Sequence, residues 1–271
     1  MDARVQTQRL FHLASAPRSS DLAPLAVMTL STSTDRPLDG KVAVLTGVSR
    51  PGQVGEAVAS HLAERGASVV LIDRTGTEAE ARASELRERG LRATAARADL
   101  TDPAQLDAVA SSVARDFGGV DALVNIAGGF AMSGKVAESD PDAWARTLEM
   151  GLKTAYLTTR AFLPLLRSRR GAVVFFSSAA ALPGGRVAEM SAYAISKAGV
   201  ITLMRSVAQE ERDTGVRSNA LAPTSIRTAA NLESIGQNAR YVEREEVADA
   251  VNFLCFSEAA KSITGQVVQL G

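Results

Sequence analysis

Short apolar runs alternate with amphipathic segments from Lys41 onward, and this alternation restricts the fold more than any other feature of the chain. The apolar runs predict buried strands, and the three-and-four spacing of apolar residues between them predicts helices. Strands separated by helices need crossover connections, which produce a parallel sheet covered on both faces. The sequence therefore predicts an α/β fold, a doubly wound parallel β-sheet with helices on both faces. The predicted strands are 42–45, 69–72, 122–124, 172–176 and 216–221.

Residues 1–38 are rich in Ser, Ala, Pro and Arg and show no sustained periodicity, which predicts a flexible N-terminal extension. Its apolar run at 22–27 is too short for the core of a signal peptide. An alternative start at Met28 and an organelle-targeting peptide are less favoured interpretations. No linker interrupts the chain after residue 40, so residues 39–271 are predicted to form a single domain.

Charge and cysteine content narrow the class of partner. The 30 basic and 30 acidic residues cancel, so no net field attracts nucleic acid or an anionic membrane. No apolar stretch is long enough to cross a bilayer. Cys255 is the only cysteine and the chain has only His12 and His61, which argues against a metal site and fits a reducing compartment. We expect a cytoplasmic protein with a small-molecule partner and without metal.

A glycine-containing turn follows the first predicted strand and directly precedes a helix. Gly47, Gly52 and Gly55 let the backbone approach a pyrophosphate, whose charge the helix N-terminus then faces. Asp73 ends the second strand, where a carboxylate can accept hydrogen bonds from ribose hydroxyls. The pattern indicates a dinucleotide site; a tight structural turn and a solvated loop acid are the alternatives.

Tyr193 and Lys197 are four residues apart, a spacing that puts both side chains on one helix face. A free phenol has a pKa of about 10, so a nearby cation favours phenolate and brings proton transfer closer to neutral pH. By itself such a pair is more often a surface or packing pair than a catalytic one. The order and context of the surrounding motifs favour the catalytic interpretation here.

Taken in order, these motifs resemble the short-chain dehydrogenase/reductase family over roughly residues 39–270. The resemblance implies a Rossmann-fold enzyme that transfers a hydride between NAD(P) and a secondary alcohol or ketone. It implies Tyr193 as proton donor or acceptor, Lys197 as the cation beside it, and a serine that hydrogen-bonds the substrate oxygen. Ser178 matches that serine by register, and Ser177, which could be a strand-end hydroxyl, is the competing candidate.

The resemblance also implies a set of cofactor-binding residues. Asp73 repels a ribose 2′-phosphate and favours NAD, whereas Arg74 and Arg50 could pair with that phosphate and favour NADP. The balance favours NAD, because the acid occupies the ribose position itself. The full set is Gly47, Ser49, Arg50, Gly52, Val54, Gly55, Asp73, Arg74, Asp99, Leu100, Asn125, Ala127, Gly128, Tyr193, Lys197, Pro223, Ile226 and Thr228.

Gly151 stands where the family has its catalytic asparagine. A glycine has no side chain to hold a relay water, and inside a helix it costs up to about 1 kcal/mol relative to alanine. We expect a slower or retuned proton relay without loss of hydride transfer. The departure also motivates two alternatives: a non-redox enzyme of the same fold (a dehydratase, isomerase or cyclase) and a cofactor-sensing binding protein.

Residues 228–244 are predicted to cap the substrate site. Arg227, Asn231 and Arg240 are candidates to contact an anionic or polar group, although a solvated lid is the more common role for such residues. In the family, the helix that carries Tyr193 pairs with the preceding helix, here around 154–166, to build dimers and tetramers. The resemblance therefore implies a homo-oligomer.

Overall fold

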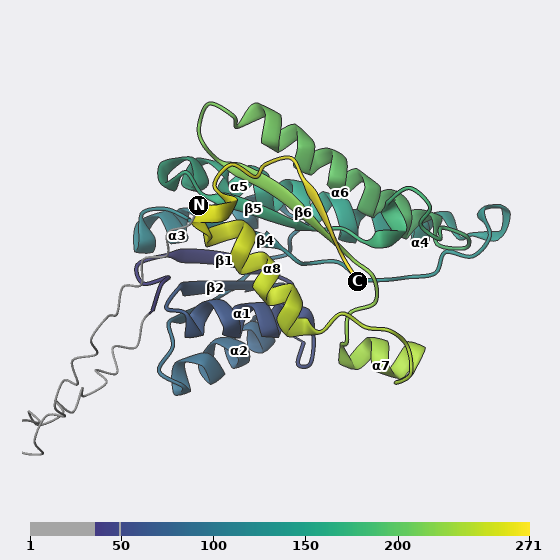
Figure 1. The fold of residues 1–271 in the computed structure, drawn as a ribbon, viewed down its shortest axis with the longest axis horizontal. Helices are drawn as coiled ribbons and strands as arrows, with labels where there is room; N and C mark the ends of the chain where they lie inside the picture. The colour runs from purple at the N-terminus through teal and green to yellow at the C-terminus, as the bar shows by residue number, and fades with distance from the viewer. Residues whose placement is uncertain (1–35, 49) are drawn as a thin grey trace, which may run out of the picture. The chain divides into compact units, whose positions relative to one another are not determined.

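The computed structural model describes residues 36–48 and 50–271, which contain a seven-stranded, fully parallel sheet with the order β3-β2-β1-β4-β5-β6-β7 (Figure 1). This topology confirms the predicted fold class. The strands are β1 (Val42–Thr46), β2 (Ser68–Asp73), β3 (Ala93–Arg97), β4 (Ala122–Asn125), β5 (Ala172–Phe176), β6 (Arg217–Pro223) and β7 (Val267–Leu270).

All five predicted strands form, with ends shifted by no more than two residues, and two further strands were missed. β3 reads Ala-Thr-Ala-Ala-Arg, a half-exposed edge strand without a run of large apolar residues. β7 reads Val-Val-Gln-Leu and forms the opposite edge. Edge strands face one neighbour only, so their sequences carry less of the apolar signal that marks a buried parallel strand.

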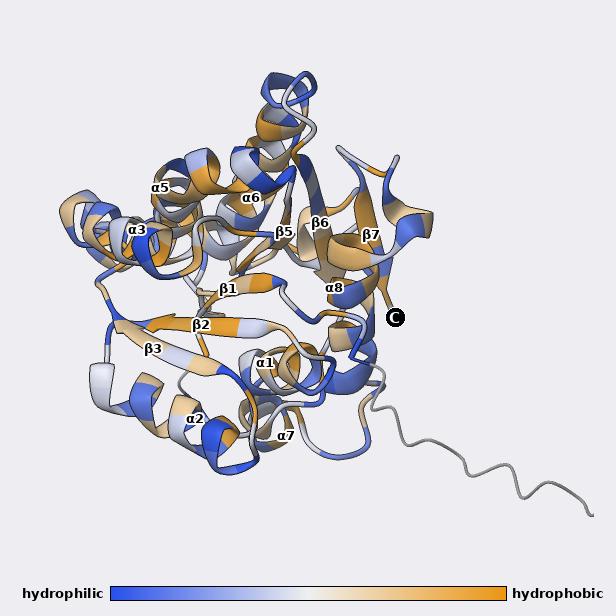
Figure 2. Ribbon diagram, turned by 90° about the vertical axis from the view of Figure 1, so that its left-hand side faces the viewer, coloured by the Kyte–Doolittle hydropathy of each residue, from blue (hydrophilic) through white to orange (hydrophobic). Residues whose placement is uncertain are grey.

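Helices cover both faces of the sheet (Figure 2). One apolar cluster packs α1, α2 and α8 on one face, and a second packs α3, α5 and α6 on the other. The helices are α1 (Val54–Glu64), α2 (Gly76–Glu88), α3 (Pro103–Phe117), α4 (Pro141–Leu148), α5 (Thr154–Arg169), α6 (Ser191–Glu210), α7 (Ala229–Ile235) and α8 (Arg244–Phe256). Short 3-10 turns lie at Val136–Glu138, Ala179–Ala181 and Glu258–Ala260, and a π-helical turn lies at Glu149–Lys153.

Asp102 caps the start of α3. The Asp102 carboxylate accepts hydrogen bonds from the backbone N–H groups of Ala104 and Gln105, at 2.9 and 3.3 Å, and Pro103 occupies the first helical position. These contacts satisfy donors that a helix N-terminus otherwise leaves unpaired. Gly118 ends the helix with a φ of 73°.

Two polar side chains fix β1 against β4 at either end. At the start of the strands, Asp121 accepts hydrogen bonds from the Val42 N–H and the Lys41 ammonium, both at 3.0 Å. At the C-terminal ends, the Thr46 hydroxyl accepts the N–H groups of Ile126 and Ala127, both at 3.2 Å. Strand order reverses beside β1, and the carboxyl ends of strands at such a point are the usual place for a ligand in a doubly wound sheet.

Leu38 is buried in the core, and its N–H donates to the Arg65 carbonyl at 2.9 Å, so the last residue of the predicted extension packs with the domain. The other predictions about the extension fall mainly on residues 1–35, which lie outside the described part of the chain. Among the described helices, none is long and apolar enough to cross a membrane.

Glu211, at the end of α6, provides a test of how the fold is held together. Its side chain is only 2% exposed, and both carboxylate oxygens accept hydrogen bonds from Arg167 of α5, at 2.5 and 2.8 Å. These bonds lower the pKa of Glu211 below its usual value. We expect Glu211→Gln to lower the free energy of unfolding by about 1–3 kcal/mol at pH 7, measured by urea denaturation.

The pH dependence of that loss follows from the lowered pKa of Glu211. The stabilisation is complete above the ordinary carboxyl pKa and disappears as the pH falls through the folded-state value, so the two proteins should converge in acid. Glu258→Gln is the control, because its exposed pair with Lys261 contributes little. Equal losses of unfolding free energy in the two variants would contradict a stabilising role for the buried pair of Glu211 and Arg167.

Candidate active site

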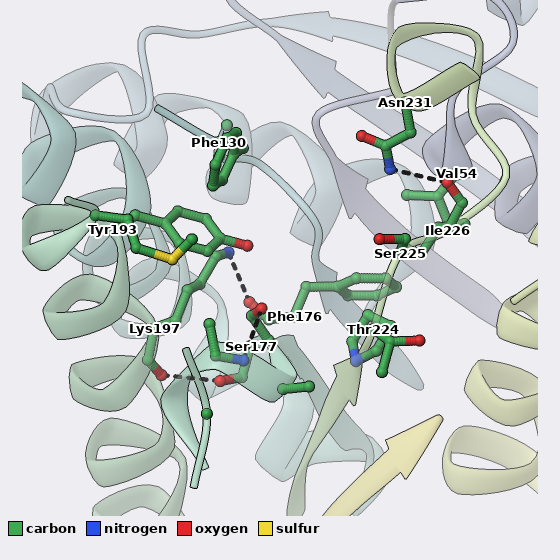
Figure 3. Close-up of a pocket in the computed structure, with 18 of the residues that line it drawn as sticks. Val54, Phe130, Phe176, Ser177, Tyr193, Lys197, Thr224, Ser225, Ile226 and Asn231 are labelled. Atoms are coloured by element: carbon green, nitrogen blue, oxygen red, sulfur yellow. Dashed lines mark hydrogen bonds between the residues drawn. The ribbon is translucent and has the colours of Figure 1, made fainter. Parts of the chain in front are cut away.

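A cavity of about 620 Å³ opens at the carboxyl ends of β4, β5 and β6 (Figure 3). The strand ends contribute Phe176 and Pro223, and α6 contributes Tyr193 and Lys197. Ser178, in the segment that follows β5, also lines the cavity. The structure therefore brings the three predicted catalytic side chains into one pocket.

Lys197 is buried between α6 and β5. Its ammonium donates to the carbonyl oxygen of Phe176, the last residue of β5, at 2.8 Å, and lies 6.0 Å from the centre of the Tyr193 ring (Figure 3). Removal from water disfavours the charged form and lowers the pKa of Lys197 to about 8. The side chain is thus a cation close to its titration point at neutral pH.

Tyr193 differs from the sequence-based expectation in its partner. Burial raises the pKa of its phenol, and a hydrogen bond with Ser178 lowers it in part. We expected Lys197 to lower this pKa; in the structure the ammonium donates to the Phe176 carbonyl, and the serine makes the lowering contact. The ring edge also meets Phe130, with 5.2 Å between ring centres and an angle of 78°.

The two candidate serines make different contacts. The Ser177 hydroxyl is buried and donates to the backbone carbonyl of Lys197 at 2.9 Å, which ties β5 to α6. The Ser178 hydroxyl accepts the Ala180 N–H at 3.3 Å and meets the Tyr193 phenol. The geometry therefore favours Ser178 as the serine of the site and gives Ser177 the structural role.

The glycines after β1 are required by close backbone contacts. A Cβ on Gly47 would lie 2.7 Å from the Ala127 Cα, and one on Gly55 would lie 2.5 Å from the Gly47 carbonyl oxygen. Gly128 has a φ of 147°, and a Cβ there would come within 3.4 Å of the Lys197 ammonium. These bare backbone surfaces at the strand ends fit the close approach that a dinucleotide requires.

Gly52, with a φ of 69°, is held by a residue that the sequence analysis did not single out. Its N–H donates to the Glu56 carboxylate at 2.6 Å, and the same carboxylate pairs with Arg82 of α2 at 3.0 Å. The contact of Glu56 with Gly52 is local, whereas its pairing with Arg82 depends on a helix distant in sequence. The remaining turn residues of the predicted set differ in position: Val54 lines the cavity, Arg50 is exposed, and Ser49 lies outside the described residues.

The predicted acids lie at strand ends. Asp73 ends β2 and accepts the Thr75 N–H at 3.2 Å. Asp99 accepts the N–H and hydroxyl of Thr101 at 2.9 and 2.7 Å, and these bonds, with a smaller effect of the Arg74 charge, lower its pKa. Arg74 is exposed and Leu100 is buried in the core.

The remaining predicted cofactor residues differ in their access to the cavity. Pro223 and Ile226 line it. The Asn125 amide donates to Thr159 at 3.0 Å, and Ala127 takes part in the Thr46 contact. The Thr228 hydroxyl accepts the Asn231 N–H at 3.2 Å and so caps α7, and this residue is not among those that line the cavity.

A sequence model described as short chain dehydrogenase matches residues 41–238. The chain belongs to the short-chain dehydrogenase family. This membership confirms the resemblance seen in the sequence. It also confirms the oxidoreductase class that the resemblance implied, with NAD(P) as the cofactor of the family. The non-redox alternatives are not favoured.

Individual short-chain dehydrogenases align over most of this chain. Galactitol 2-dehydrogenase of Rhizobium johnstonii is 38% identical, over 86% of this chain and 94% of its own length. Cis-4-hydroxycyclohexanecarboxylate dehydrogenase of Sinomonas cyclohexanicum is 37% identical, over 84% and 94%. The crystal structure of gox2181 superposes with a TM-score of 0.80 at 29% identity, covering 88% of this chain and 96% of that one.

Of the lid residues singled out in this short-chain dehydrogenase, only Asn231 lines the cavity, and its amide donates to the Ile226 carbonyl at 2.8 Å. Arg227 pairs with Glu243 at 2.7 Å and stacks over Tyr241. Arg240 is exposed and is not among the lining residues. Ile235, inside the predicted cap at 228–244, also lines the cavity. Three further lining residues had no signal in the sequence: Phe130, Arg186 and Met190.

Gly151 is buried in the π-helical turn that leads into α5. A Cβ at this position would lie 2.6 Å from the Ser196 hydroxyl oxygen and 3.0 Å from its Cβ. The Ser196 hydroxyl in turn donates to the Tyr193 carbonyl at 2.8 Å. Close packing against α6 therefore accounts for the glycine, and the space needed by the first atom of an asparagine side chain is occupied by Ser196.

Gly151→Asn should consequently disturb packing as well as the proton relay. We expect a loss of about 1–3 kcal/mol in the free energy of unfolding, because the new side chain overlaps Ser196. Adding Ser196→Gly should recover part of this loss, although a helical glycine itself costs about 1 kcal/mol. Thermal denaturation of the single and double variants measures how strongly the effects at positions 151 and 196 depend on each other. Gly129→Ala is the control, because a Cβ at Gly129 meets nothing within 4 Å. Strictly additive losses would refute the steric argument.

Lys197→Met should stabilise the protein at neutral pH while removing the cation of the site. The folded-state pKa of Lys197 is about 8, below its ordinary 10.5, so wild type gains stability as the pH rises between these values. We expect the variant to exceed wild type by about 1–3 kcal/mol at pH 7, and the difference to shrink towards pH 10.

Denaturant unfolding at pH 7 and pH 10 measures this difference. Lys153→Met, at a half-exposed lysine paired with Glu149, is the control and should not show the same pH trend. A variant less stable than wild type at pH 7 would mean that the hydrogen bond to Phe176 outweighs desolvation.

Proposed function

We propose that Ser178, Tyr193 and Lys197 are the catalytic residues of an NAD(P)-dependent reaction that interconverts a secondary alcohol and a ketone. The observation that carries the proposal is their meeting in one cavity, with Ser178 hydrogen-bonded to the Tyr193 phenol and a buried ammonium beneath the tyrosine ring. The bound cofactor supplies or accepts the hydride at the nicotinamide.

In the reductive direction, Tyr193 donates its proton to the substrate oxygen while the carbonyl carbon receives the hydride. The raised pKa of Tyr193 keeps the phenol protonated at neutral pH, as a proton donor requires. Ser178 donates a hydrogen bond that orients the substrate oxygen. Lys197, about 6.0 Å from the ring centre, stabilises the phenolate that remains until solvent returns the proton.

NAD is the favoured cofactor, with NADP as the alternative. Support comes from Asp73 at the end of β2, since a carboxylate there accepts ribose hydroxyls and repels a 2′-phosphate. Arg50 and Arg74, both exposed, are the groups that would favour NADP. Gly47 and Gly55 contribute the bare backbone and the shape of the turn after β1.

Residues 39–271 act as one domain on a small-molecule carbonyl or alcohol in the cytoplasm, as a homodimer or homotetramer. The two relatives named above, both alcohol dehydrogenases by name, support the substrate class. Half-exposed apolar side chains of Met150, Tyr156 and Ile195, on the π-helical turn, α5 and α6, support self-association. Cys255, the only cysteine of the sequence, has no second cysteine with which to form a disulfide within the chain, which fits a reducing compartment.

Equilibrium titration with NADH and NADPH, followed by a ketone-reduction assay, tests the proposal. Wild type should bind NADH more tightly than NADPH, and Asp73→Ala should weaken NADH by about tenfold through the loss of charge-assisted hydrogen bonds. Tyr193→Phe should retain NADH binding and lose turnover by at least about a hundredfold, because the substitution removes only the hydroxyl that donates the proton.

Matched substitutions make the result specific. Tyr156→Phe alters a half-exposed tyrosine on α5, and Asp116→Ala alters an exposed helix acid; both should leave binding and turnover unchanged. Absence of binding to either cofactor, or full turnover in Tyr193→Phe, would overturn the proposed function.

A further inference from the structure

Arg186 lines the same cavity as Tyr193 and has no assigned role. Within the described residues its guanidinium makes no hydrogen bond and no ion pair, whereas Arg227 of the lid is paired with Glu243. Arg186 and Lys197 are the only charged side chains among the described residues that line the cavity, and none of these lining residues is acidic. The pocket therefore has two cations and no carboxylate to neutralise them.

The segment that carries Arg186 is fixed at both ends. On one side, Gly185 packs so closely on the backbone after Ser178 that a Cβ would lie 2.6 Å from the carbonyl oxygens of Ala179 and Ala180. On the other side, Glu189 has a φ of 61°, and its carbonyl accepts the N–H groups of Ser133 and Gly134 at 2.7 and 3.0 Å. Arg186 is thus held near Ser178 by backbone contacts that need no ligand.

Apolar side chains complete this part of the cavity. Phe130 meets the edge of the Tyr193 ring and is 60% exposed, and Ile235 is 51% exposed. Met190, which precedes α6, lines the pocket with them. Large apolar groups left in contact with solvent around a pocket are typical of a surface that a ligand covers.

Arg186 lies in the segment after β5, and the place of that strand in the sheet argues against a role for Arg186 in binding the cofactor phosphates. The glycine turn follows β1, whereas Arg186 follows β5, and β4 lies between these two strands in the sheet. The segment after β5 also carries Ser178, the residue proposed to hold the substrate oxygen. Arg186 therefore lies on the substrate side of the cavity.

We propose that Arg186 binds an anionic group, a carboxylate or a phosphate, on a substrate whose apolar body packs against Phe130, Met190 and Ile235. This inference rests on the proposed function, because it concerns the substrate of the same site. A guanidinium presents two parallel N–H donors to such a group, which provides orientation as well as affinity. The substrate is then fixed at two points, its reacting oxygen at Ser178 and its anion at Arg186.

Matched pairs of charged and neutral ketones test the assignment. The first pair is 6-oxoheptanoate and its primary amide, and the second is 6-oxoheptyl phosphate and the corresponding alcohol, 7-hydroxyheptan-2-one. Wild type should prefer the anion of at least one pair by about tenfold in kcat/KM, a modest value because Arg186 is exposed. Preference within the first pair identifies a carboxylate, and preference confined to the second identifies a phosphate.

Arg186→Gln should reduce that preference to about one, mainly through KM, and should leave NADH binding unchanged. Arg186→Lys should retain part of the preference, since it keeps the charge but loses the paired donors. Arg205→Gln is the control, because Arg205 is an exposed arginine of α6 that does not line the cavity. A preference that survives in Arg186→Gln, or an equal loss in Arg205→Gln, would overturn the assignment.

Binding measured by saturation-transfer NMR, without turnover, separates this inference from the proposed function. If wild type reduces neutral and charged ketones equally well, the function stands and the anion site is rejected. If no ketone is reduced, but an anion binds to wild type and not to Arg186→Gln, the anion site stands and the proposed reaction is rejected. Failure of wild type to bind or reduce any of the four compounds would reject the anion site.

Discussion

The site depends on one buried contact, the hydrogen bond from the Lys197 ammonium to the carbonyl of Phe176. This bond connects the end of β5 to α6, and the Ser177 hydroxyl adds a second connection by donating to the Lys197 carbonyl. Since Tyr193 lies one helical turn before Lys197, fixing the lysine also fixes the phenol. Burial of the ammonium disfavours its charged form, as the lowered pKa of Lys197 indicates. The arrangement therefore lowers the free energy of unfolding, and in return it holds a charge in a fixed position.

Most of the architecture could be predicted from the sequence, because buried parallel strands carry a strong signal. β1, β2, β4, β5 and β6 are buried along most of their length, and each was recognised as an apolar run. The two edge strands were missed, since half of β3 faces solvent and β7 has only four residues.

The candidate site was only partly predictable from the sequence. Residues close together along the chain could be recognised, and residues brought together from separate segments could not. Tyr193 and Lys197 share one helix, so their spacing along the chain reports their proximity in space. Phe130, Arg186 and the pairing of Glu56 with Arg82 depend on contacts between separate segments, and no local pattern marks them. The spacing predicted Lys197 as a neighbour of Tyr193 on one helix face, but its burial and its hydrogen bond to a strand carbonyl required the structure, because only the packing of α6 on β5 brings the two together.

Gly151 shows how packing can account for a residue that motif comparison marks as a defect. Compared only with the family motif, it lacks an amide; in the structure, it makes room for the Ser196 hydroxyl, which donates to the Tyr193 carbonyl in the same helix that carries the site. A side chain at 151 and a hydroxyl at 196 compete for one space, so the two positions are expected to vary together. The departure from the motif therefore reflects how α6 packs against the π-helical turn, and Tyr193 and Lys197 on the same helix still line the cavity.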